Sequence, residues 1–348
     1  MRNETGRLSS DEVDLLVLIR GIWRQKLLVF IVTALAVAVA VSYALLATPV
    51  YEAKAFIQPP TNNEIVNLNY GRGGEGGLKL LSAKDVYEVY LSNLTSESLR
   101  RQFFREQYLP YVQGARNGSR DDLYVRFNTQ VVATVAKDGV GRSSVSVLLN
   151  DPEVAAGWVD EYLKIASERA KLEIIGNVRA DATIKVGNLQ QQISEARKSA
   201  QKQREDRIAQ LNEALRVAKS IGLERPPIIS NSISTEITAG MTGSLAYMRG
   251  SKALEAEIEN LRQRTSDDPF VDDLREWQEQ LEFYRTLHVD PQSIDVYRQD
   301  GAIQMPDAPI KPKKAIIITL GAIFGLLLGV LIACVRTLLL RDSPARLQ

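Results

Sequence analysis

Two long uncharged stretches, one near each end, constrain this chain more than any other feature. Leu27–Ala47 and Ala315–Val335 each run about 21 residues without a charged side chain. At about 1.5 Å per helical residue, either stretch is long enough to cross the hydrocarbon core of a bilayer. The alternatives are a cleaved signal peptide for the first stretch and a buried core helix for the second. The first is longer than a signal-peptide core and the second is hard to place in a soluble core, so we predict two transmembrane helices.

Charged residues beside the two stretches predict the topology. Arg20, Arg24 and Lys26 lie before the first stretch, and Arg336 and Arg341 follow the second. Basic residues near membrane spans favour the cytoplasm, so we expect both termini to be cytoplasmic and the residues between the spans to lie on the other side. Three lysines on the far side oppose this orientation, but they end a long translocated domain, where the rule is weak: Lys311, Lys313 and Lys314.

Composition excludes several function classes. A formal net charge of +1 with 24% charged residues excludes a nucleic-acid-coating or strongly acidic protein. The single cysteine, Cys334, lies inside the second span, and the single histidine, His288, is too few for a histidine metal site. The sequence also lacks the G-x-x-x-x-G-K-[ST] phosphate loop of a fused kinase. We therefore predict no enzymatic activity, no cofactor and no metal. The competing hypothesis is an enzyme, a glycan hydrolase with paired carboxylates. Its candidate acids lie mainly on a long solvated helix, where acidic residues usually form only a solvated surface.

The region after the first span predicts a small α+β module. Tyr51–Gln58 is rich in β-formers, and Ser143–Leu149 alternates apolar and polar residues, as in a half-buried strand. We also expect strands over Leu123–Phe127 and Gln130–Ala136, with one or two helices over Leu80–Tyr111. Candidate helix caps are Asp85 and either Thr95 or Ser96.

A glycine-rich run interrupts this module. Gly71, Gly73 and Gly76 formally match G-x-G-x-x-G. In a dinucleotide-binding unit such glycines directly follow a strand and open a helix. Here about a dozen loop residues separate them from the preceding strand, so a flexible loop is the better interpretation.

One very long helix dominates the middle of the chain. Asn150–Glu153 combines a cap residue, a proline and an acid, which is a typical helix start, and no further proline occurs before Pro226. Apolar residues then recur mostly every three or four positions, as in a helix that packs along a narrow seam. A continuous helix would have about 70 residues. The polar run Arg197–Arg207 is either a nucleic-acid patch or, as we expect, a solvated stretch of helix.

A turn over Gly222–Gly243 and a returning helix follow. Asp268 and Pro269 restart this helix, and five apolar residues then step by four, three, four and three: Phe270, Leu274, Trp277, Leu281 and Tyr284. This pattern predicts a partner helix. The partner is either the outgoing helix, packed antiparallel, or the same helix of a neighbouring subunit.

The C-terminal part contains a proline connector and a glycine ridge. Ser293–Ile303 is expected to return as a strand to the α+β module. Prolines at every third position favour a stiff extended connector, with an ordinary linker as the alternative: Pro306, Pro309 and Pro312. Glycines at every fourth position of the second span allow another helix to approach closely, and predict packing or partner contact: Gly321, Gly325 and Gly329.

The predicted fold is a membrane protein with two transmembrane helices, an α+β membrane-proximal periplasmic base and a very long antiparallel helical hairpin. Before the first span, Asp11–Lys26 predicts an amphipathic helix that either lies on the membrane or extends the span. The predicted domains are a cytoplasmic segment (1–26), transmembrane helix 1 (27–47), the base (48–150), the hairpin (151–290, distal turn near 222–243), the return strand and connector (291–314), transmembrane helix 2 (315–335) and a cytoplasmic tail (336–348).

This organisation resembles the Wzz chain-length determinants of bacterial surface polysaccharides, the first class of polysaccharide co-polymerases. The resemblance covers nearly the whole chain. It rests on DLLVLIRGIWRQK (Asp14–Lys26), the DPEVA helix start (Asp151–Ala155), the very long helix and the proline- and glycine-rich end. The family pattern P-x2-P-x4-S-P-K is shortened here, because only Ile310 and Lys311 separate Pro309 from Pro312, and its serine is absent.

The resemblance implies a non-catalytic protein of the Gram-negative inner membrane that sets the length of O-antigen made by the Wzy polymerase. The implied assembly is a homo-oligomer whose partners are Wzy and membrane lipid, with the growing polysaccharide as a further contact and no nucleic acid. Length control would follow either from positioning of the polymerase or from glycan contact along the helices. The alternative is a co-polymerase or export adaptor for capsule or exopolysaccharide that works with a separate kinase.

Overall fold

The computed structural model describes residues 23–74, 77–112, 119–136, 141–227 and 243–341. Contacts divide the chain into two compact units. The first contains the residues up to 60, residues 87–170 and those from 296 onward, and the second contains residues 61–86 and 171–295. Several predicted features lie outside the described residues: most of the amphipathic helix before the first span, the distal turn over 228–242 and the tail after 341.

A four-stranded antiparallel sheet organises the first unit. Its strand order is β2-β3-β1-β4, with β1 at Tyr51–Gln58, β2 at Val131–Thr134, β3 at Ser143–Leu149 and β4 at Arg298–Gln299. Ala55 of β1 pairs with Val145 of β3, and both side chains are buried. The predicted strands over β1 and β3 are confirmed, because alternation of buried and outward residues fixes their register. The predicted return strand reduces to the two residues of β4, which pair with Ile57 and Gln58.

Short helices connect the strands. They are α3 (Ala83–Leu94), α4 (Glu97–Phe103), a π-helical turn (Phe104–Tyr108), α5 (Leu109–Val112) and α6 (Arg120–Gln130). Ser96 caps α4 as predicted, since its side chain accepts a hydrogen bond from Leu99 N. The predicted cap of α3 is wrong: Ser82 is the cap, and Asp85 is its partner, whose carboxylate accepts from Ser82 N at 2.8 Å. These hydrogen bonds lower the pKa of Asp85.

The strand predicted over Leu123–Phe127 is also wrong, because these residues belong to α6. The run of Leu, Tyr, Val and Phe has high β-propensity. A capping box overrides this preference: the Ser119 side chain accepts from Asp122 N while the Asp122 side chain accepts from Ser119 N. Phe127 then completes the burial of an aromatic cluster with Phe103, Phe104 and Tyr108.

The long helix is confirmed as α7, Pro152–Ser220, with 69 residues. Asp151 caps its start, since Oδ1 accepts from Glu153 N at 2.9 Å. Its end is a Schellman motif: Gly222 has φ +67° and Leu223 N donates to Ala218 O. Gly176 and Gly187 lie within the helix and do not interrupt it.

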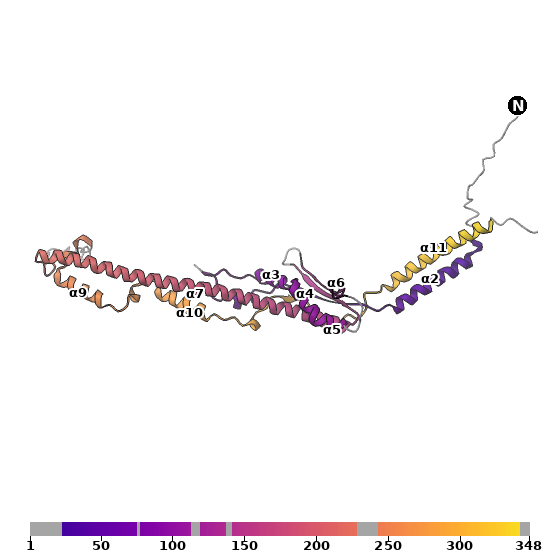
Figure 1. Cartoon of the computed structure of the whole chain (residues 1–348), viewed down its shortest axis with the longest axis horizontal. Helices are drawn as coiled ribbons and strands as arrows, with labels where there is room; N and C mark the ends of the chain where they lie inside the picture. Colours follow the sequence, from indigo (N-terminus) through magenta and orange to yellow (C-terminus); the bar gives the residue numbers. More distant parts are fainter. Residues whose placement is uncertain (1–22, 75–76, 113–118, 137–140, 228–242, 342–348) are drawn as a thin grey trace, which may run out of the picture. The chain divides into compact units, whose positions relative to one another are not determined.

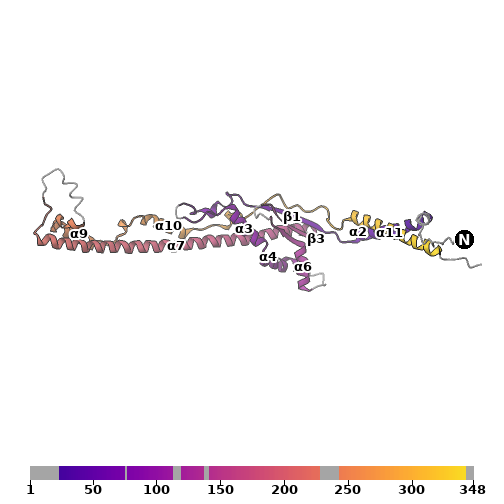
Figure 2. The same cartoon turned by 90° about the horizontal axis from the view of Figure 1, so that it is seen from above.

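The return segment runs antiparallel to α7 in the second unit. It contains a 3₁₀ turn (Gly243–Arg249), α9 (Ser251–Gln263), a second 3₁₀ turn (Asp268–Phe270) and α10 (Leu274–Thr286). Figures 1 and 2 both show α9 and α10 lying along α7. Two apolar clusters hold them there. The α9 cluster joins Leu211 and Ala218 to Leu254, Ile258 and Leu261. The α10 cluster joins Ala182 and Leu189 to Tyr284, with Trp277 and Leu281 packed against it.

The two uncharged stretches form α2 (Lys26–Leu46) and α11 (Lys314–Arg341). Figure 1 shows them side by side. Both are long and apolar enough to cross a membrane, and only 6% and 11% of their apolar windows are buried. A core helix of a soluble protein would be mostly covered, so this exposure supports the prediction of two spans.

Candidate functional site

The five predicted seam residues do not share one environment. Leu274 and Tyr284 are buried, and Trp277 and Leu281 pack against the cluster that Tyr284 forms with Ala182 and Leu189 of α7. Phe270 instead lies in the preceding 3₁₀ turn and is 63% exposed. Asp273, in the left-handed region at φ +57°, separates this turn from α10. The break shifts the helical register, so Phe270 does not continue the face that the other four residues form.

Phe270 has a different contact. The Arg264 guanidinium carbon lies 3.7 Å from the centroid of its ring. This distance is typical of a cation–π contact. The ring therefore belongs to a polar segment between α9 and α10 rather than to the seam.

That segment, residues 264–273, forms a polar joint between the two apolar clusters. Arg204 of α7 lies 3.1 Å from Asp267 and also donates to the Arg264 carbonyl, while Arg197 binds Asp268 through two nitrogens. This pairing lowers the pKa of Asp268 and raises that of Arg197. The sequence predicted a solvated helix surface over Arg197–Arg207. Three arginines of this run instead pair with the return segment: Arg197 and Arg204, as described, and Arg207, which contacts Glu257. The adjacent carboxylates of Asp267 and Asp268 are the sequence signal that could have indicated this joint.

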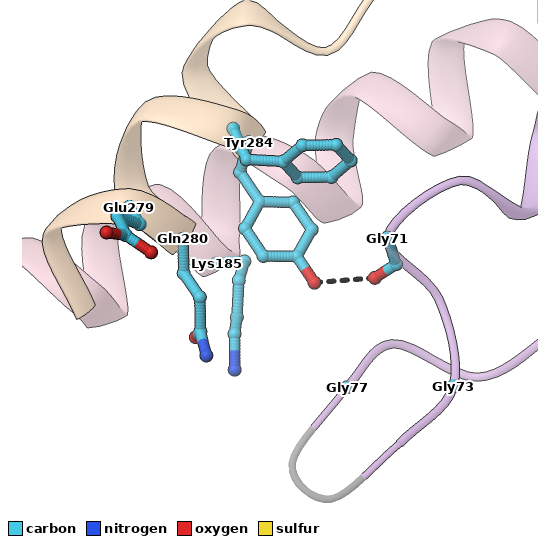
Figure 3. A pocket seen from close by; sticks show the side chains of 8 residues that line it. Gly71, Gly73, Gly77, Lys185, Glu279, Gln280 and Tyr284 are labelled. Atoms are coloured by element: carbon cyan, nitrogen blue, oxygen red, sulfur yellow. Dashed lines mark hydrogen bonds between the residues drawn. The ribbon is translucent and has the colours of Figure 1, made fainter. Parts of the chain in front are cut away.

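A groove lies between α7, α10 and the glycine run (Figure 3). One wall is the backbone of Gly71, Gly73 and Gly77. The other carries the side chains of Lys185, Glu279, Gln280, Phe283 and Tyr284. Tyr284 donates a hydrogen bond of 2.6 Å from Oη to the Gly71 carbonyl, the contact drawn in Figure 3. The glycine run, interpreted from sequence as a flexible loop, is thus attached to the seam. Its contact residues lie far apart in the chain, which is why sequence reasoning missed them.

The three glycines of α11 face α2 of the same chain. A Cβ atom built on Gly321 would lie 2.6 Å from the Ala40 Cβ, and one built on Gly325 would lie 2.7 Å from the Ala36 Cβ. A Cβ on Gly329 would lie 3.1 Å from the Cα of Val29. Glycine therefore permits this close approach, as is typical of helix pairs in lipid. Contact of this ridge with another subunit or a polymerase stays a prediction.

A side-chain hydrogen bond joins the N-terminal end of α2 to the C-terminal part of α11. Gln25, before α2, donates from Nε2 to the Thr337 hydroxyl at 3.2 Å. Since Gln25 precedes the start of α2 and Thr337 lies near the end of α11, the two helices run antiparallel. Arg24 and Lys26 consequently lie at the same end of the pair as Arg336.

The predicted connector is partly paired. Pro306, Pro309 and Pro312 lie in a segment without helix or strand. Val50 N donates to the Lys311 carbonyl at 3.0 Å, and Ile310 N donates to the Val50 carbonyl at 2.8 Å. The Lys311–Pro312 peptide is cis. The connector is therefore bound to the residue that precedes β1, and a role beyond this contact stays a prediction.

Ionisable groups in the first unit serve packing. Burial raises the pKa of Tyr162 to about 12, and its hydroxyl donates to the Leu94 carbonyl at 2.9 Å. Burial likewise raises the pKa of Tyr90, whose ring stacks on Tyr297 at 4.6 Å. Both hydroxyls remain protonated at neutral pH. Over the described ranges, we found no group of three or more His, Cys, Asp or Glu residues arranged to hold a metal ion.

Comparison with known proteins agrees with this architecture. The family model for Wzz, the chain length determinant protein, matches residues 11–107. A chain length determinant protein of Escherichia coli O111:H- is 24% identical over 337 residues, which cover 94% of this chain and 93% of the relative. A full-length bacterial polysaccharide co-polymerase has a TM-score of 0.69 at 22% identity, covering 96% of this chain and all of the other. The chain is thus similar to Wzz chain length determinants over nearly its whole length.

Two further similarities add to this comparison. A Wzz dodecamer studied by cryo-EM has a TM-score of 0.50 at 17% identity, covering 76% of this chain and 99% of the other. A second model, GNVR, described as a G-rich domain on a tyrosine kinase, matches residues 296–338. That range contains the proline connector and the glycine ridge of α11.

Proposed function

We propose that this chain regulates the length of a bacterial surface polysaccharide, as a non-catalytic homo-oligomer of the inner membrane. The observation that carries this proposal is the likeness to a full-length polysaccharide co-polymerase over 96% of the chain, both terminal helices and the α7 hairpin included. The relatives named chain length determinants and the Wzz dodecamer support the two parts of the proposal, length control and assembly.

The basic ends of the helix pair support the proposed orientation. Arg24, Lys26 and Arg336 lie together at one end. By the positive-inside rule this end is cytoplasmic. Both termini would then be cytoplasmic, and the sheet and the α7 hairpin would be periplasmic.

The finer proposal is that the polysaccharide is O-antigen and that the chain acts with the Wzy polymerase. The second candidate function is a co-polymerase or export adaptor for capsule or exopolysaccharide. The match of residues 296–338 to a domain described on a tyrosine kinase favours this candidate. The chain carries no phosphate loop of its own, so a kinase would be a separate protein.

Deleting the gene separates the two candidates. Lipopolysaccharide and capsular or secreted polysaccharide from the deletion strain are analysed by gel electrophoresis beside those of the parent. Regulation of O-antigen predicts loss of the modal cluster of lipopolysaccharide bands while polymer is still made. Unchanged lipopolysaccharide with loss of another polymer would overturn the first candidate and support the second.

A further inference from the structure

The glycine run has no part in the membrane anchor or the sheet, yet it is built into the second unit by many contacts. Asn69 exchanges two hydrogen bonds with the backbone of Leu81, at 2.9 and 2.8 Å. Arg72, whose side chain is 4% exposed, lies 2.7 Å from Asp181 of α7 and donates to the Lys79 carbonyl. Gly73 N donates to the Leu78 carbonyl at 2.8 Å. Both legs of the run are therefore fixed, which is how a binding site keeps its shape in the absence of ligand.

The ring of Phe283 leaves no room for a side chain at Gly71. Its φ is +69°, and a Cβ there would lie 2.2 Å from Cε1 of Phe283. The backbone thus passes directly against the Phe283 ring. Gly74 has a similar φ of +77°, but a Cβ there would meet nothing within 4 Å. Both glycines have a positive φ, but only at Gly71 would a side chain displace the Phe283 ring.

The lining of the groove suits a neutral polyhydroxylated ligand. Its volume is about 460 Å³ and it is open to solvent. Gln280 carries an acceptor oxygen and two N–H groups, one of which donates to Glu276 Oε1 at 3.0 Å, while Glu279 carries acceptors and Lys185 carries donors. The ring of Phe283 is 42% exposed and stands nearly perpendicular to Tyr284. An apolar face beside a few polar groups is the usual composition of a small-molecule site.

Other ligand classes fit less well. One lysine is balanced by one glutamate, so the groove lacks the excess positive charge that a nucleotide or phosphate would need. One carboxylate is too few for a calcium or magnesium ion. A saccharide offers hydroxyl groups for the polar wall and a C–H face for the aromatic ring, and an open groove admits an internal unit of a long polymer.

We propose that this groove is a saccharide subsite that holds one or two sugar units of the surface polysaccharide as it passes the hairpin. Phe283 stacks on the sugar, Gln280, Glu279 and Lys185 bind its hydroxyl groups, and the glycine run leaves room for the ring. This proposal rests on the proposed function, and it places a glycan contact at named residues of the hairpin.

Saturation-transfer NMR on the full-length protein in detergent tests the subsite. The probe is a set of oligosaccharides of one to three repeat units, released from the polysaccharide of the source bacterium. We expect clear transfer with the native chain and about tenfold weaker binding for Phe283→Ala and for Gln280→Ala. Phe270→Ala, which removes another exposed ring of the return segment, serves as the control and should bind normally. Gly71→Ala should weaken binding while Gly74→Ala should not.

Three results would overturn the subsite. One is an absence of transfer with a native protein that restores modal polysaccharide length in the deletion strain, in which case the proposed function survives without the subsite. A second is unchanged saccharide binding by Phe283→Ala. A third is a loss of saccharide binding that follows loss of the cross-linked oligomer in the same variant, which would make the groove a protein contact. Failure of the native protein to restore modal length would instead defeat the proposed function.

Discussion

The chain contains two antiparallel helix pairings that are built from different residues. Between α2 and α11, three glycines face Ala36, Ala40 and Val29, and the contact is close backbone packing. Between α7 and the return segment, large apolar side chains form two clusters separated by the polar joint. Water drives apolar side chains together, whereas lipid does not, so a pairing in lipid depends on close packing. The two pairings should therefore fail through different changes.

The largest expected effect is on the apolar seam of α10. Replacing Leu274 and Leu281 with glutamate places charges in an apolar seam, and we expect a loss of more than about 4 kcal/mol of seam stability. The oligomer should disperse and the polysaccharide length distribution should flatten. Chemical cross-linking and a polysaccharide gel measure the two outcomes.

Phe270→Glu is the matched control for this prediction. The periodicity of the sequence places Phe270 on the same seam as Leu274, but the Phe270 ring is exposed in the structure. We expect this variant to keep the oligomer and the native length distribution. An intact cross-linked oligomer in the Leu274 and Leu281 double variant would contradict the importance of the seam.

The next effect concerns the glycine ridge. Leucine at Gly325 and Gly329 would clash with Ala36, Thr33 and Val29, and we expect a cost of about 1–3 kcal/mol at each site. Insertion into the membrane should persist while α2 and α11 separate and modal length is disturbed. Thr319→Leu, at an exposed position of α11, adds similar bulk away from the ridge and should have no effect. Normal modal banding in the double glycine variant would reduce α11 to an anchor.

The polar joint should respond less strongly. Arg204→Ala leaves the Asp267 carboxylate, 10% exposed, without this partner, and we expect a loss of about 2 kcal/mol. Arg197→Ala breaks the more exposed pair with Asp268 and should cost less than about 1 kcal/mol. Hydrogen exchange of α9 in the full-length protein compares the two variants. Equal protection in both would show that the joint contributes through something other than burial of the ion pair.

The smallest effect is a dependence on pH. The hydrogen bond from Arg197 lowers the pKa of Asp268 in the folded chain. A carboxylate with a lowered pKa stabilises the fold fully above its ordinary pKa, and this contribution is lost as the pH falls below about 4. Exchange around residues 264–273 should therefore increase at acidic pH in the native chain and change less in Asp268→Asn. The same acid response in both would assign it to other carboxylates.

Local sequence signals predicted much of the fold. The spans, β1, β3 and the start of α7 follow from patterns within a few residues: uncharged length, alternation, and a capping aspartate before proline. The same kind of evidence failed at α6, where β-forming residues were overridden by the Ser119 capping box. It also failed at Phe270, because one residue at positive φ, Asp273, breaks the helical register.

The candidate sites were harder to predict because they depend on residues far apart in the chain. Tyr284 contacts Gly71 and Arg72 contacts Asp181, and no local pattern links these positions. The polar joint likewise pairs Arg204 with Asp267 across the hairpin. The glycine ridge of α11 had a local signature, but the sequence could not tell that α2 of the same chain covers it.

The length distribution of the surface polysaccharide tests the central claim most directly. A strain lacking the gene is complemented with the native chain or with empty vector, and the ladder of chain lengths is quantified on one gel. If the chain regulates length, the native chain restores a narrow modal cluster, while the vector strain makes polymer whose abundance declines smoothly with length. The same distribution of chain lengths in both strains would contradict the account.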